Sequence, residues 1–198
     1  MKIAKVVSSN SHVEYIARVL DSLDVSDPPV PGSFGFGSFV SIGSEGSETI
    51  GVVFNSLLLN PEYASFGPRL SSDGELATFS PDFLHEQGSL LAILLLGNKE
   101  GENDSSKQSI PFPVIPPGSD VSVLEEEDFR GFHTNDEGNV SLKYYSLVLS
   151  HAGSFAVPLL ETVIEKLSGM CDSEGEKKKL EVLRKSLVWQ RTVGQMRL

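Results

Sequence analysis

Cysteine is almost absent from this sequence, and so are the usual marks of secreted or membrane proteins. Cys171 is the single cysteine in 198 residues, which excludes an intramolecular disulfide and fits a reducing compartment. Residues 1–15 lack the apolar stretch and small-residue cleavage site of a signal peptide. The most apolar run, Leu90–Leu96, is far shorter than the roughly 20 residues that span a bilayer. We therefore expect a soluble, cytoplasmic protein that makes no membrane contact.

Motifs for catalysis and for cofactor binding are absent as well. The sequence contains neither a P-loop nor the G-x-S-x-G of a nucleophile elbow. His85-Glu86 begins like the zinc motif HExxH, but Ser89 stands where the second histidine belongs. The four histidines are scattered and form no short-spaced pair. We predict a protein that is not an enzyme and holds no metal or cofactor; the open alternative is an unfamiliar site among the polar loops around Arg69 and Asp82.

Charge is plentiful but unevenly distributed. The net charge is −11, which argues against a general binder of polyanions. Residues 1–120 hold 6 Lys/Arg against 15 Asp/Glu, whereas residues 177–198 hold 7 Lys/Arg and only Glu181. The sequence thus predicts an acidic body with a basic tail. The candidate interaction residues are Arg69, in a loop, and the tail residues Lys177, Lys178, Lys179, Arg184, Lys185, Trp189 and Arg191.

Short apolar runs separated by turn residues dominate the N-terminal part. We predict strands over 2–8, 12–20, 34–43, 49–59, 75–79 and 90–97, a helical turn over 80–84 and an exposed loop over 98–108. A helix over 12–20 competes with the strand there. Gly35, Gly37 and Gly51 favour bends, and closure into a barrel removes the edges of so many short strands. A proline-rich connector over 111–117 ends this part.

The remaining chain has helical periodicity. We predict helices over 123–132, 142–151, 154–169 and 176–192, the third one with apolar residues at i, i+3, i+7 and i+10 from Val157. The predicted fold is therefore α+β. Its mainly β N-terminal half is a small closed antiparallel β-barrel of about six strands, and a C-terminal α-helical extension follows. We place the barrel domain at residues 1–117 and the helical region, packed on or beside the barrel, at residues 118–198.

Three segments of the N-terminal part resemble a known barrel. They are the opening pair KIAKVVSSNSHVEYIARV, the segment around GSFVSI, and TIGVVFNSLLLNPEY. The pattern resembles the HerA–ATP synthase (HAS) barrel, shared by HerA-type DNA-translocating ATPases and the head subunits of rotary ATP synthases. Gly37, Val40 and Ile42 match its G-x-x-V-x-I segment, and Ile50–Val53 matches its glycine-centred return strand. Because no P-loop follows, the resemblance implies the docking part of such proteins without their motor.

These observations support two functional hypotheses for a chain whose oligomeric state the sequence leaves open. The first is a non-enzymatic protein-interaction module, accessory to a HerA-like ATPase or its associated nuclease, as the resemblance implies. The alternative is a nucleic-acid-binding accessory protein that uses the basic C-terminal helix for backbone contacts. A structural interpretation of that helix also stands, in which Leu180, Leu183 and Leu187 pack on the barrel and the basic face only offsets the acidic body.

Overall fold

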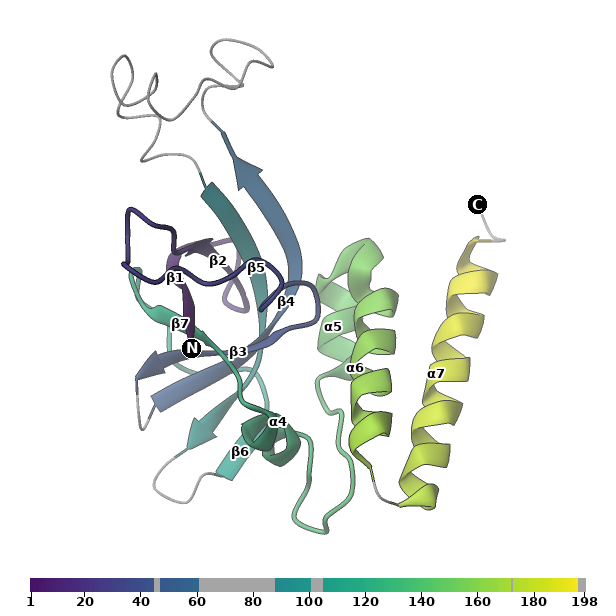
Figure 1. The fold of residues 1–198 in the computed structure, drawn as a ribbon. Helices are drawn as coiled ribbons and strands as arrows, with labels where there is room; N and C mark the ends of the chain where they lie inside the picture. The colour runs from purple at the N-terminus through teal and green to yellow at the C-terminus, as the bar shows by residue number, and fades with distance from the viewer. Residues whose placement is uncertain (45–46, 61–87, 101–104, 172, 196–198) are drawn as a thin grey trace.

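The computed structural model describes residues 1–44, 47–60, 88–100, 105–171 and 173–195, and its N-terminal part is a closed antiparallel barrel (Figure 1). In order around the barrel, the six strands are β2 (Glu14–Val19), β1 (Lys2–Ser9), β7 (Asp120–Val123), β3 (Phe39–Ser44), β4 (Ser47–Leu59) and β5 (Gly88–Glu100). Pairing of β5 with β2 closes the ring. The predicted fold class, a small closed β-barrel followed by helices, is confirmed. The strand expected over 75–79 and the helical turn over 80–84 lie outside the described residues.

Strand β5 organises the closure of the barrel and, like β4, has 13 residues. One edge pairs with β4 from Gly88 to Glu100, while the other is shared by β2 and by the short strand β6 (Ser105–Gln108). Every residue of Leu91–Leu96 is buried. One face of β5 lines the barrel and the other lies under the helices. Because both faces are buried, the sequence of the strand is a continuous apolar run.

Two short polar strands were not predicted. Strand β6 occupies part of 98–108, where we expected an exposed loop, and Asn98–Glu100 continues β5. Strand β7 fills the gap between β1 and β3, so the barrel extends to Val123, beyond the expected boundary after residue 117. Strand β7 is stabilised by pairing with β1 and β3, which lie far away along the chain, whereas β6 pairs with the adjacent end of β5. In both cases pairing, and not local propensity, defines the strand.

In the part of the chain that the structure describes, five helical segments follow the barrel, and they run close to the predicted helices. They are α4 (Glu126–Phe132), α5 (Tyr145–His151), a 3-10 turn η1 (Gly153–Phe155), α6 (Ala156–Met170) and α7 (Glu174–Gln195). Pro158 is tolerated because it lies in the first turn of α6, where its missing N–H has no helical partner. None of the helices in the described ranges combines the length and the apolar character needed to cross a membrane.

Two of the glycines at which we predicted bends lie at close contacts. A Cβ on Gly51 would lie 2.7 Å from Ile93 Cγ2, and the β4–β5 register shifts at this residue. Gly37 has a φ of +79° and lies against Thr162 of α6. The loop before β3 therefore touches the helical region, and Phe36 of that loop lies 5.9 Å from Phe155 between ring centroids.

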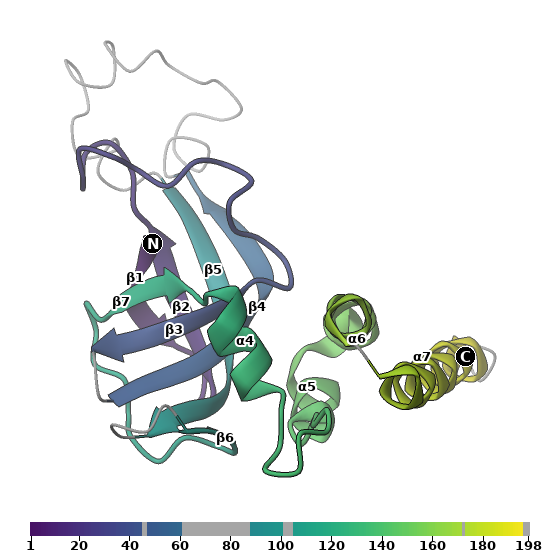
Figure 2. The same ribbon diagram turned by 60° about the horizontal axis from the view of Figure 1, so that its bottom comes forward.

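A single continuous core joins the barrel to the helices. The buried cluster contains barrel residues such as Phe39 and Leu94 together with Leu160 and Ile164 of α6. Phe39 of β3 packs edge-on against Phe129 of α4, with ring centroids 4.8 Å apart. Helices α5 and α6 lie beside β4 and β5, while α7 lies on the far side of α6 from the barrel (Figures 1 and 2).

Candidate interaction surfaces

The residues predicted from the basic tail fall on one helix, α7. Lys177, Lys178, Lys179, Arg184, Lys185 and Trp189 all lie on α7, whereas Arg191 belongs to the helix but its side chain lies outside what the structure describes. Arg69 lies outside the described residues. The structure thus brings the tail residues together by helical spacing and leaves the loop candidate untested.

The inner face of α7 packs on α6 and not on the barrel. Leu180 and Leu187 are buried, and Leu183 packs against the same core. The interpretation that these leucines pack on the barrel is therefore wrong, because α6 lies between α7 and the strands (Figure 2). Helix α7 therefore adds an outer layer on α6, and its buried leucines extend the core cluster that the barrel and the other helices share.

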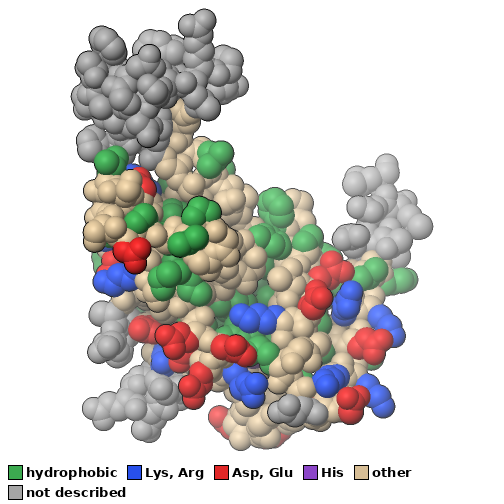
Figure 3. Space-filling model, in the orientation of Figure 1, with side chains coloured by type: hydrophobic (Ala, Val, Ile, Leu, Met, Phe, Trp, Pro, Cys, Tyr) green, Lys and Arg blue, Asp and Glu red, His purple; other side chains and the backbone are tan. Residues whose placement is uncertain are grey.

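Ion pairs within α7 neutralise much of its positive charge. Lys179 Nζ lies 2.6 Å from Glu176 Oε1, and Lys185 Nζ lies 2.7 Å from Glu181 Oε1. Lys177 lies 3.6 Å from Glu174. Acidic and basic side chains are thus mixed on this part of the surface (Figure 3). Such exposed pairs contribute little to stability, but they reduce the attraction of this face for polyanions.

Glu176 has a second role as the link between α7 and the rest of the molecule. Its Oε2 accepts a hydrogen bond from the Val140 backbone N–H at 3.0 Å. The hydrogen bonds from Lys179 and from Val140 lower the pKa of the Glu176 carboxyl. Val140 lies at the end of a tight turn in which Asn135 Oδ1 accepts hydrogen bonds from the backbone N–H groups of Glu137 and Asn139. The start of α7 is therefore fixed in place.

The outer face of α7 carries an ordered set of exposed side chains, which we name the outer stripe: Lys178, Val182, Lys185 and Trp189. Their spacing of i, i+4, i+7 and i+11 places them on one helix face, opposite the buried leucines. Val182 is 68% exposed and Trp189 is 67% exposed. Two cationic and two apolar side chains thus alternate along a face that makes no contribution to the core.

A second exposed surface lies on the proline-rich connector, which we name the apolar ridge: Ile110, Phe112 and Val114. Phe112 is 96% exposed, and its two neighbours on the ridge are also largely exposed. The backbone beneath the ridge is anchored on both sides. His12 Nε2–H donates to the Pro111 carbonyl at 2.7 Å, and Ile115 N–H donates to the Tyr15 hydroxyl at 3.2 Å. The chain thus presents the Phe112 side chain to solvent from a backbone that is anchored on both sides.

A groove of about 380 Å³ adjoins the ridge between α5 and the β5–β6 edge. Leu96, Tyr144 and Leu147 supply its apolar lining, and Ile110 contributes to both the ridge and the groove. Its polar residues are Gln108, Ser109, Lys143, Ser146, Ser150 and His151. His151 Nδ1 lies 2.8 Å from Glu14 Oε1, so the groove wall on α5 is attached to strand β2.

The buried pair His133 and Tyr144 is the strongest candidate for a catalytic site that the sequence does not reveal. Both ring nitrogens of His133 and the hydroxyl of Tyr144 form hydrogen bonds inside the protein. His133 Nδ1–H donates to the Phe129 carbonyl at 2.7 Å, so Nε2 must accept the hydrogen bond from the Tyr144 hydroxyl, 2.5 Å away. Burial lowers the pKa of His133 to about 4, and burial raises the pKa of Tyr144 well above its ordinary value. The pair is neutral and held apart from solvent.

His133 also lines a cavity of about 240 Å³ between the end of α4 and the α6–α7 connection. Arg130, Cys171 and Glu176 contribute to the same lining. Because Glu176 is engaged with Lys179 and Val140, and both ring nitrogens of His133 are engaged inside the protein, the cavity offers no arranged nucleophile and base. Within the described ranges, no group of three or more His, Cys, Asp or Glu side chains could hold a metal ion.

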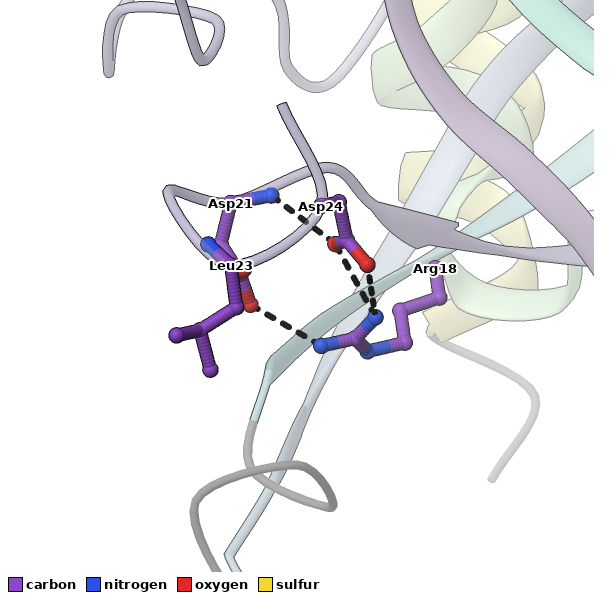
Figure 4. Close-up of polar contacts among 4 residues, drawn as sticks. All are labelled: Arg18, Asp21, Leu23 and Asp24. Atoms are coloured by element: carbon purple, nitrogen blue, oxygen red, sulfur yellow. Dashed lines mark hydrogen bonds and ion pairs between the residues drawn. The ribbon is translucent and has the colours of Figure 1, made fainter. Parts of the chain in front are cut away.

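The charged cluster after β2 has a structural role. Arg18 forms hydrogen bonds of 3.0 and 3.2 Å with the two carboxylate oxygens of Asp24 and one of 2.9 Å with Asp21 (Figure 4). Burial acts to raise the pKa of Asp24, but the Asp21 backbone N–H and the Arg18 guanidinium outweigh it and lower that pKa. Asp21 also accepts from the Leu23 N–H at 2.8 Å, so the cluster closes a turn.

Sequence reasoning missed the apolar ridge, and of the outer stripe it predicted Lys178, Lys185 and Trp189 but not Val182. The alternation of Ile110, Phe112 and Val114 was visible, but exposure on the connector depends on the anchoring by His12 and Tyr15, which are about 100 residues away. On α7, Val182 lies three to four residues from each lysine of the stripe. This spacing places it on the same helix face as the lysines and could have been recognised in the sequence.

Comparison with known proteins identifies the family. Residues 1–197 match the family described as "Domain of unknown function (DUF8166)", which covers the barrel and the helices together. No curated protein matches the chain. The chain belongs to the DUF8166 family.

Proposed function

We propose that this member of the DUF8166 family is a non-enzymatic protein-interaction module that docks through the apolar ridge and the adjoining groove. The observation that carries the proposal is Phe112, whose ring is 96% exposed although its backbone is anchored on both sides. An exposed aromatic side chain on a rigid backbone is a good anchor for a partner, because little conformational entropy is lost on binding.

The groove beside the ridge supports the same proposal. It joins the ridge at Ile110 and has an apolar floor with a polar rim, which is the usual composition of a docking surface on a protein. A partner segment lying across the ridge and the groove would bury the ridge and could form hydrogen bonds with Ser146 and Ser150 of α5. The hydrogen bond between His151 Nδ1 and Glu14 Oε1 holds the groove wall in position for this role.

The finer part of the proposal concerns the partner and the compartment. We propose a HerA-like ATPase or its associated nuclease as the partner, in the cytoplasm. Support comes from the resemblance of the barrel segments to the HAS barrel and from the absence of a P-loop in the sequence. The matching residues Gly37, Val40 and Ile42 lie before and within β3, next to Ile50–Val53 of β4. A single cysteine is consistent with a reducing compartment.

Purification of the tagged chain from its native cells tests the proposal. We expect one stoichiometric protein to be retained by the wild type and lost with Phe112→Ser. Leu23→Ser, a matched change of an exposed apolar residue on the Asp21–Asp24 turn, should retain it. Absence of any stoichiometric protein, or equal loss in both variants, would contradict the proposal.

Nucleic-acid binding by α7 is the second candidate function. It is favoured by Trp189, which can stack on a base, and by the neighbouring lysines of the outer stripe. It is opposed by the ion pairs of α7 and by the acidic body. Fluorescence anisotropy with single- and double-stranded DNA at low salt decides the matter, because binding should disappear when Lys177, Lys178 and Lys179 are replaced by alanine.

A further inference from the structure

Helix α7 has two distinct faces, and only the inner one is used by the fold. Leu180 and Leu187 are buried against α6, while the outer stripe faces solvent on the opposite side. Because α6 separates α7 from the barrel, the stripe contacts neither the barrel core nor the apolar ridge (Figure 2). The packing of this chain therefore does not explain why the apolar residues Val182 and Trp189 occupy exposed positions.

The outer stripe is also rigid before any ligand binds. The buried leucines hold the middle of α7, and the hydrogen bond from Val140 N–H to Glu176 fixes its start. From Lys178 to Trp189 the stripe is about 16 Å long at the rise of an α-helix. An extended, preorganised face of this length suits another helix lying alongside, with apolar side chains meeting Val182 and Trp189.

The charges of the stripe specify the chemistry of that helix. Lys178 and Lys185 flank Val182, and Lys185 precedes Trp189 by one helical turn. A partner helix whose apolar residues are flanked by Asp or Glu would place a carboxylate beside each lysine. The exposed pair between Lys185 and Glu181 is weak enough to exchange for such a carboxylate.

A nucleic acid fits the same face less well. Glu174, Glu176 and Glu181 are interspersed with the lysines of α7, and residues 1–176 hold 26 Asp/Glu against 9 Lys/Arg. A polyphosphate backbone would meet this acidic charge over a long range, whereas a short acidic helix meets only the stripe. The observations therefore favour a protein ligand.

We propose that the outer stripe of α7 binds an acidic amphipathic helix of a protein partner. This site is separate from the apolar ridge, so it goes beyond the function proposed above and either proposal can fail alone.

Trp189 provides the test, because it is the single tryptophan of the chain and lies within the proposed site. The full chain is titrated with a synthetic amphipathic helix of about 18 residues, or five turns, with leucines at the stripe spacing and glutamates beside them. We expect a blue shift of the Trp189 emission and a Kd at least ten-fold lower than for the same peptide with lysines in place of glutamates.

Charge reversal supplies the matched variants. Lys178→Glu with Lys185→Glu should weaken binding of the acidic peptide at least ten-fold and reverse the preference between the two peptides. Lys107→Glu, an exposed change on β6, should leave both affinities unchanged. Phe112→Ser should also leave the titration unchanged, which separates this proposal from the function of the ridge. Circular dichroism establishes that each variant is folded.

Three results would overturn the proposal. The first is no change of Trp189 emission with the acidic peptide, and the second is binding that does not respond to reversal of Lys178 and Lys185. The third is a larger response to a thymidine oligonucleotide than to the acidic peptide, which would assign the stripe to nucleic acid.

Discussion

His133 is almost fully buried, and both of its ring nitrogens form hydrogen bonds inside the protein. The carbonyl of Phe129 can only accept, so the proton of the neutral ring lies on Nδ1 and Tyr144 donates to Nε2. We predict that Tyr144→Phe lowers the free energy of unfolding by about 1–3 kcal/mol, because it leaves Nε2 buried without a donor. Urea denaturation measures this. Tyr145→Phe, on the neighbouring half-buried tyrosine, should change stability by less than about 0.5 kcal/mol.

The lowered pKa of His133 also makes stability depend on pH. Burial lowers this pKa from 6.5 to about 4, so between these values the unfolded chain binds a proton that the folded chain does not. The contribution to stability is complete above pH 6.5 and is lost as the pH falls toward 4, by about 3 kcal/mol in total. Urea midpoints across this range and the NMR titration of the ring provide the check. Titration of the folded-state ring near pH 6.5 would contradict the account.

The role of this histidine could not be predicted from the sequence. His133 follows Phe129 by four residues, which allows a contact on one helix, but Tyr144 reaches it only through the turn at Asn135–Val140. In contrast, Gly51 was predicted as a bend in its strand, and the β4–β5 register shifts there, because a glycine inside a strand pattern is typical of a bulge.

At the scale of elements, β5, β6 and α4 meet at Gly97. A Cβ there would clash with the Lys107 carbonyl oxygen and lie 2.8 Å from Phe132 Cε2. We predict that Gly97→Ala costs about 3 kcal/mol of unfolding free energy, since backbone and a buried ring must both move. Gly35→Ala is the matched control, because a Cβ at Gly35 meets nothing within 4 Å. Thermal denaturation measures both variants. Equal melting temperatures for Gly97→Ala and Gly35→Ala would contradict the close packing at Gly97.

The hairpin of α6 and α7 offers a second comparison. Leu187→Ala should destabilise the protein by about 2–4 kcal/mol, or detach α7 in a separate transition, because Leu187 is fully buried. Val182→Ala on the outer stripe should leave the melting curve within about 0.5 kcal/mol of the wild type. Hydrogen exchange of α7 distinguishes local detachment from global unfolding. Equal effects of the two changes would mean that the two faces of α7 are not distinct.

The predictability of the elements follows from how each one is stabilised. Runs of apolar and β-branched residues predicted β1, β2, β4 and β5, and helical periodicity predicted α6 and α7. Strand β6 reads Ser-Ser-Lys-Gln and carries no such pattern; its pairing with Gly97–Glu100 defines it. Strand β7 follows a proline-rich connector and is formed by pairing with β1 and β3 on either side.

At the scale of the whole molecule, one core unites two parts that the sequence presents as separate. The change in composition near residue 117 is real, but Phe129 and Leu160 pack in the same cluster as the barrel strands. Sequence periodicity shows that a helix has an apolar face and does not show what covers it. For that reason the tail was predicted as a basic helix, while its packing on α6 and the exposure of Trp189 emerged only from the structure.

The most direct test of the central claim, that the apolar ridge docks a protein partner, is crosslinking from position 112. A photoreactive phenylalanine analogue replaces Phe112 in one strain and Leu23 in another, and both are irradiated in native cells. We predict one dominant adduct from position 112, containing a P-loop ATPase or its nuclease, and none from position 23. The absence of an adduct at position 112, or the same set of adducts at both positions, would contradict the claim.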